Sequence, residues 1–237
     1  ASAGIVDNFD TLKLKSDSVL PHVRTDIVQY LKESRSFAVK RAQLNYFINP
    51  LNDIYAKASI GYFEEMFGGM GGEVLYRPYN KNFGIGAEIW RVKKREFDQL
   101  LKFRKYQTTT GHINLYYKHP ISQIILQIKG GRFLAGDSGL NFDFSRRFKS
   151  GLRMGAFFSI TDISKEEFGE GSFDKGFYFH IPIESFFESF SKGNAGFGLR
   201  PITRDGAAIL VHGFHLWGVT EQAQSTNLTR DWDDLYD

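Results

Sequence analysis

The chain has 237 residues, a formal net charge of +3 and no cysteine. These values exclude disulfides, thiolate metal sites and cysteine nucleophiles, and so small and dispersed a charge does not favour a nucleic-acid partner. No stretch approaches the roughly 18 continuous apolar residues of a membrane-spanning helix, which excludes a helical membrane protein.

The first 35 residues differ in pattern from the rest of the chain. Leu12 and Leu14 alternate with lysines, which is compatible with an extra strand, and residues 23–33 have the apolar spacing of a short amphipathic helix. No signal peptide is visible and the chain does not begin with Met, so we expect a mature chain or an excised piece. Residues 1–35 are therefore interpreted as an N-terminal segment with a short helix.

From Phe37 onward, apolar and polar side chains alternate between Gly, Pro, Asn and Asp breaks, which predicts about eleven β-strands. The expected ranges are 36–48, 53–63, 72–78, 83–92, 107–117, 121–131, 139–147, 151–160, 173–183, 195–201 and 208–218. The β-structure thus occupies residues 36–219. Residues 220–237 form a C-terminal tail, in which a short helix is predicted over 226–236.

The connections between these strands alternate in length. Tight turns are expected at 49–52, 78–82, 118–120 and 149–151, and longer connections at 64–71, 93–106, 132–138 and 161–172. Bacterial outer-membrane barrels have short periplasmic turns and longer extracellular loops, an order that a sandwich has no strong reason to keep. The pattern favours an all-β chain forming an antiparallel outer-membrane β-barrel of about 11–12 strands, with a periplasmic C-terminal tail.

The two faces of each predicted strand differ in polarity. Leu126 and Ile128 point one way, for example, while Gln127 and Lys129 point the other. A membrane barrel turns its apolar face to lipid and its polar face to a wet lumen. A soluble sandwich turns its apolar face to the core, so alternation alone leaves a periplasmic β-sandwich that binds glycan or partner proteins as the alternative.

Several long motifs occur in one order from about Asp10 onward. They are VRTDIVQYL (23–31), GYFEEMFGGMGGEVLYRPY (61–79), VKKREFD (92–98), TTTGHINLYY (108–117), GRFLAGDSG (131–139), FGEGSFDKGFYFHIPI (168–183) and LRPITRDG (199–206). In these motifs the chain resembles the C-terminal portion of the YjbH/GfcD-type family of outer-membrane exopolysaccharide (group 4 capsule) biogenesis proteins.

The resemblance implies a β-barrel in the outer membrane of a Gram-negative bacterium that takes part in export or assembly of a surface polysaccharide. It implies outer-membrane lipid, the exopolysaccharide and other export proteins as partners. The family proteins are considerably longer than this chain. The strands therefore either close alone or are completed by a missing N-terminal portion or a second chain.

Under this reading, charged side chains near the long connections or on the polar face would line a passive path for a hydrated glycan. The lumen and glycan-path candidates are Glu65, Arg77, Arg91, Lys93, Arg95, Arg132, Asp137, Asp143, Arg147, Arg153, Glu170, Asp174, Lys175, Arg200, Arg204 and Asp205. The alternative for any one of them is that it pairs with another charge and fixes a loop.

Catalysis and metal binding have little support in the sequence. Glycosidases use paired carboxylates, but adjacent Glu64 and Glu65 would point to opposite faces of a strand, although a pair drawn from two loops stays open. Four histidines, at positions 112, 180, 212 and 215, share no metal-ligand spacing. We therefore expect no catalytic residue, no metal and no cofactor.

Overall fold

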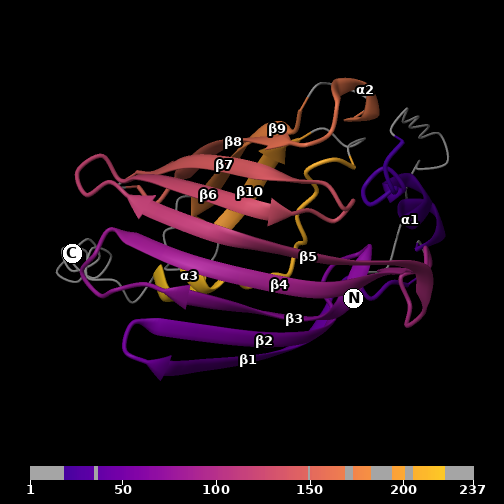
Figure 1. Cartoon of the computed structure of the whole chain (residues 1–237), viewed down its shortest axis with the longest axis horizontal. Coiled ribbons are helices and arrows are strands. Elements are labelled where there is room, and N and C mark those ends of the chain that lie inside the picture. Colours follow the sequence, from indigo (N-terminus) through magenta and orange to yellow (C-terminus); the bar gives the residue numbers. More distant parts are fainter. Residues whose placement is uncertain are drawn as a thin grey trace.

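The computed structural model describes residues 19–34, 37–148, 150–168, 173–182, 194–200 and 205–221. These residues form one antiparallel sheet of ten strands, in which each strand pairs with its neighbours in the sequence (Figure 1). The strands are β1 (Ala42–Leu51), β2 (Ile54–Tyr62), β3 (Phe67–Tyr76), β4 (Phe83–Arg95), β5 (Phe103–Lys118), β6 (Ile124–Arg132), β7 (Ser138–Arg147), β8 (Arg153–Thr161), β9 (Lys175–Pro182) and β10 (Asn194–Leu199).

Three short helices accompany the sheet, and the first confirms the helix predicted near the N-terminus. They are α1 (Ile27–Glu33), α2 (Lys165–Phe168) and α3 (Leu216–Glu221). The expected extra strand near Leu12 and the helix over 226–236 lie outside the described residues. The prediction of an all-β antiparallel chain is confirmed. Within the described ranges, however, β1 and β10 do not pair with each other, so the sheet is open.

Burial alternates along the strands in the opposite sense to that of a soluble protein. On β5, Ile113 and Leu115 are exposed, whereas His112 and Asn114 are buried. The same inversion holds on β4, where Ile89 is 63% exposed and Glu88 only 7%. We call the face that carries His112 and Glu88 the inner face, and the opposite, apolar one the outer face.

The strand predicted over 208–218 is wrong. Residues 205–215 form an irregular segment that leads into α3, and Figure 1 shows this part of the chain lying behind β3 to β5. Ala208, Leu210 and His212 are buried at alternate positions because one side of the segment packs against the inner face of the sheet. Alternation of this kind imitates a strand although the segment does not join the sheet.

Two of the predicted long connections are also shorter than expected. β3 already begins at Phe67, because the glycine-rich run that follows pairs with β2 on one side and β4 on the other. β4 continues to Arg95 and β5 begins at Phe103, so much of 93–106 is strand. The regular alternation of short and long connections is therefore weaker in the structure than in the sequence.

Two small apolar clusters hold the ends of the inner face. At one end, α1 and the residues before it pack on β3, β4 and the 133–137 turn through Val23, Tyr30, Phe67, Val92 and Leu134. At the other end, Leu216 and Trp217 of α3 pack on Leu75 and Tyr116. Between these clusters the inner face is polar, and that is where the candidate site lies.

Candidate functional site on the inner face

A row of ionisable side chains crosses the middle of the inner face. Lys57 of β2 lies opposite Glu73 of β3, Glu73 lies opposite Glu88 of β4, and Glu88 lies opposite His112 of β5. Because directly opposed residues of an antiparallel pair point to the same side of the sheet, the register alone brings these groups together. All four are buried.

The segment 205–221 supplies the groups that face this row. His212 places Nε2 2.9 Å from a carboxylate oxygen of Glu88, and its Nδ1 3.0 Å from Nζ of Lys57. Lys57 Nζ also donates to the carbonyl oxygen of Phe214 and lies 3.3 Å from Glu73. Glu73 in turn accepts the backbone N–H of Leu216 at 3.1 Å, where α3 begins. The buried charges thus hold the segment 205–221 against the inner face of the sheet.

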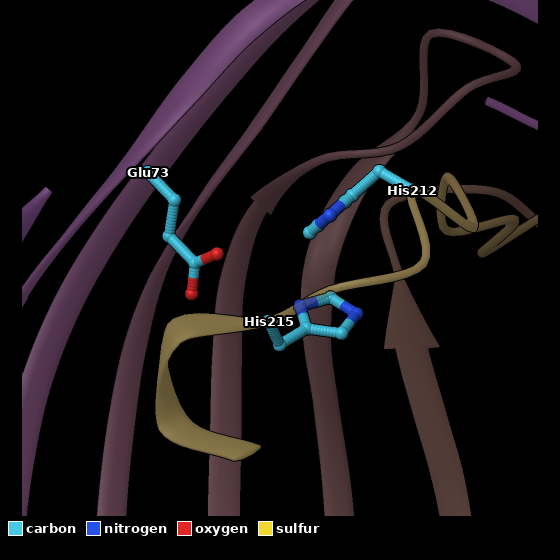
Figure 2. Close-up of side chains that lie close together, drawn as sticks. All are labelled: Glu73, His212 and His215. Atoms are coloured by element: carbon cyan, nitrogen blue, oxygen red, sulfur yellow. The ribbon is translucent and has the colours of Figure 1, made fainter. Parts of the chain in front are cut away.

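Among the residues that the structure describes, Glu73, His212 and His215 could hold a metal ion (Figure 2). Their candidate ligand atoms lie within 4.8 Å of one another, and two imidazoles with one carboxylate are a ligand set that zinc accepts. Burial lowers the pKa of His212 and holds the pKa of His215 well below its ordinary value, which favours the neutral form that a metal ligand needs. The Lys57 ammonium, however, already contacts Glu73 and His212. The expectation that the chain binds no metal stays a prediction.

Aromatic contacts anchor the segment on both sides of the charged row. The indole of Trp90 stacks on the His212 ring with centroids 4.4 Å apart and donates to Glu88 at 3.0 Å. Trp217 stacks on Tyr116, also at 4.4 Å, and the Arg77 guanidinium lies 3.6 Å from the Trp217 ring centre. Arg77 further donates to the carbonyl oxygen of Trp217 at 2.7 Å.

Two buried aspartates hold the beginning of the segment at the α1 end. Asp205 accepts the backbone N–H groups of Val23, Arg24 and Thr25, at 2.8, 2.8 and 3.1 Å. Asp137 accepts the N–H of Ala207 at 2.7 Å, while burial raises the pKa of its carboxyl group. These contacts tie the segment to the residues before α1 and to the turn between β6 and β7.

The inner face of β7 to β9 carries a second polar group of residues that is only partly buried. Tyr178 donates its hydroxyl to Asp143 at 2.8 Å. Arg153 donates from two nitrogens to Ser145 Oγ, at 3.1 and 2.9 Å. This part of the inner face therefore presents hydroxyl, carboxylate and guanidinium groups in one continuous area.

Comparison with known proteins identifies the family. The family model described as "Exopolysaccharide biosynthesis protein YbjH" matches residues 1–222. The chain belongs to the YjbH family. It is 36% identical over 225 residues to the "Uncharacterized lipoprotein YjbH" of Escherichia coli (strain K12), an alignment that covers 92% of this chain and 32% of that protein.

This YjbH-family chain thus spans about a third of the length of its curated relative. No solved structure matches it significantly. In the part of the chain that the structure describes, no helix is long and apolar enough to cross a bilayer.

The structure places the sequence-predicted site residues in four situations. Asp143, Arg147 and Arg153 lie on the inner face. Arg91 and Lys93 lie instead on the exposed outer face, because β4 keeps strict alternation and turns Trp90 and Val92 inward. Glu170 and Arg204 lie outside the described residues.

The remaining candidates sit at the ends of strands or in connections, and most have partners there. Glu65 pairs with Lys40 at 3.1 Å, and Asp174 accepts from Arg200 at 2.9 Å. Arg95 is fully buried and donates to backbone carbonyls, including those of Val39 and Glu64. Arg77 and Asp137 bind the segment 205–221, and Asp205 ties the first residue of that segment to residues 23–25. Arg132 and Lys175 are exposed.

The sequence alone does not show that Lys57, Glu88 and His212 lie together in one cluster. Polar residues at alternate positions of β2, β4 and β5 were the available signal, since they share a face. The register that aligns them depends on turn geometry, and the contact with His212 joins residues more than a hundred positions apart. Neither can be read from local pattern.

Proposed function

We propose that this chain is the C-terminal portion of an outer-membrane β-barrel that takes part in export or assembly of a surface exopolysaccharide in the Gram-negative envelope. The observation that carries this proposal is the inversion of burial across the ten strands. The outer face exposes large apolar side chains, and the inner face buries paired charges. A wall of that kind suits lipid on one side and a polar interior on the other.

The size and continuity of the apolar outer face support lipid as its partner. Exposed side chains on neighbouring strands adjoin one another in register: Leu44 lies opposite Ile60, which lies opposite Met70, and Ile85 lies opposite Leu115. Contiguous exposed apolar surface on a soluble monomer is normally restricted to a few hundred Å². In a bilayer the same surface is the stable arrangement.

The open sheet fits a barrel that other strands complete. A membrane barrel leaves no edge unpaired, because unsatisfied backbone groups are costly in lipid. Because the chain spans 32% of its relative, the remainder of a longer polypeptide, or a second chain, would supply the strands beside β1 and β10. The relative's name as a lipoprotein agrees with a place in the cell envelope.

The proposed role is passive rather than enzymatic. The buried carboxylates of Glu73 and Glu88 are bound to Lys57, His212 and the start of α3. Glu64, at the α1 end, pairs with Arg24 at 2.8 Å. A glycosidase needs two carboxylates that face a common substrate, and these three are engaged in holding the fold.

Fractionation tests the proposal against a soluble periplasmic sandwich. We expect the full-length protein to require detergent for extraction from the outer-membrane fraction. We also expect its electrophoretic mobility to change on heating, as is usual for folded membrane barrels. A protein that stays in solution without detergent and shows no heat-dependent mobility would contradict the barrel and favour a binding protein of the same pathway.

A further inference from the structure

Three basic side chains stand side by side at one end of the inner face. Arg147 of β7 lies opposite Arg153 of β8, and Arg153 lies opposite His180 of β9. The donation from Arg153 to the buried Ser145 shows that this row points inward. We call Arg147, Arg153 and His180 the basic row.

Within the described ranges, no carboxylate forms a salt bridge with the basic row, although Asp143 interacts electrostatically with Arg153 and His180. Arg153 uses Nε and Nη2 on the hydroxyl of Ser145, and the buried Nε of Arg147 makes no hydrogen bond. Asp143, which lies two residues before Ser145 on the same face, already accepts from Tyr178. Like charges placed directly opposite each other destabilise a sheet. An anion bound between Arg147 and Arg153 would therefore offset the repulsion of their charges and stabilise the sheet.

Aromatic rings, a hydroxyl group and a carboxylate lie beside the basic row. The rings of Tyr178 and His180 lie 5.3 Å apart on β9. Their neighbours across the β9–β10 ladder are Gly198 and Gly196, which have no side chain to cover the rings on that side. An aromatic ring such as that of Tyr178 can pack against a pyranose ring, while hydroxyl and carboxylate groups beside it bind the sugar's hydroxyls.

We propose that the basic row binds the carboxylate of an acidic polysaccharide, with a sugar ring against Tyr178. Guanidinium groups suit this role because they bind carboxylates with two parallel hydrogen bonds. The inference rests on the proposed function and narrows it to glycans that carry carboxylate groups, such as uronic acids.

Titration calorimetry on the detergent-solubilised full-length protein tests this inference. The probes are tetragalacturonate, which carries a carboxylate on each sugar, and uncharged maltotetraose. We expect tetragalacturonate to bind at least about tenfold more tightly, because each charge-assisted hydrogen bond contributes on that scale. The preference for tetragalacturonate should disappear at 1 M salt, because the Debye length is then about 3 Å and the charges are screened. This comparison needs no variant.

A matched pair of variants assigns the binding to the basic row. R147Q/R153Q should weaken tetragalacturonate binding at least about tenfold. R146Q changes the neighbouring arginine, which lies on the exposed outer face, and should leave binding within about twofold. The far-UV circular dichroism spectrum of each variant reports whether it still folds.

Three results would overturn the inference: equal binding of both probes, equal effects of R147Q/R153Q and R146Q, or competition by inorganic phosphate as strong as that of tetragalacturonate. The last would indicate a general anion site. Because binding is measured on purified protein, these results are independent of the fractionation that tests the barrel.

Discussion

At the scale of single residues, the Lys57 ammonium is the centre of the buried cluster. Its side chain is fully inaccessible, and it touches Glu73, His212 and the carbonyl of Phe214. Burying a charge is tolerated only where partners replace the lost water. Glu73 belongs to β3, and His212 and Phe214 belong to the segment 205–221, so this one side chain couples β2, β3 and that segment.

Replacing Lys57 by Met should destabilise the protein by about 3–5 kcal/mol, because the Glu73 carboxylate is left buried without its cation. The measurement is the free energy of unfolding in urea. K57M/E73Q removes both charges and should cost less than K57M alone. K175M, at an exposed position, is the control and should stay within about 0.5 kcal/mol. If K57M lowered the free energy of unfolding as little as K175M does, the buried Lys57–Glu73 pair would not contribute to stability.

Asp137 allows a prediction of pH dependence. Burial raises the pKa of its carboxyl group above the ordinary value of 3.8, so the folded state holds the proton more tightly than the unfolded state. As pH falls from the raised value toward 3.8, the wild type should gain stability relative to D137N. D137N keeps an oxygen that can accept from Ala207 and has no carboxyl to titrate. Urea midpoints of both proteins at pH 7 and pH 4 measure the difference, and parallel pH profiles would contradict the assignment.

At the scale of elements, the sequence predicted the strands and their faces better than it predicted their ends. Alternation separates Leu115 from Asn114 by burial and Leu126 from Gln127 by register, because side-chain direction on a strand has a strict period of two. It cannot show where pairing stops. β4 continues through Lys93 and keeps its alternation, so Arg91 and Lys93 share the outer face with Ile89.

The segment 205–221 illustrates a different limit of sequence reasoning. Its alternating burial resembles that of a strand, but side chains satisfy its backbone: Gln43 donates to the carbonyl of His212, and Glu64 accepts the N–H of Val211. Gly213 adopts a positive φ of 83°, which ends the extended stretch before α3. Only the tertiary contacts distinguish this inner segment from an eleventh strand.

Close packing of α3 on the wall can be tested at Gly84. A Cβ atom at this position would lie 2.8 Å from Cζ3 of Trp217, so G84A should force the helix away and cost about 1–3 kcal/mol. Gly218, inside α3, has open space around it, and G218A should stabilise the protein by about 0.5–1 kcal/mol. Unfolding midpoints compare the two variants. Equal effects would mean that α3 does not pack on the sheet as described.

At the scale of the whole molecule, the fold is organised around an inner face that is buried and polar and an outer face that is exposed and apolar. The sequence indicated both faces but not which of them encloses the core. That choice follows from the segment 205–221, which packs on the charged side through His212 and Trp217. Closure of the sheet could not be predicted, because the partners of β1 and β10 are not among the described strands.

The most direct test of a lipid-facing wall compares two arginine substitutions on neighbouring strands of the full-length protein. Leu115 is 45% exposed on the outer face, and Gln127 lies on the opposite face of β6. If the outer face meets lipid, L115R should destabilise the protein folded in lipid vesicles by about 2–4 kcal/mol near the bilayer midplane, and Q127R should destabilise it by clearly less. Equal tolerance of both substitutions would contradict a membrane-facing wall.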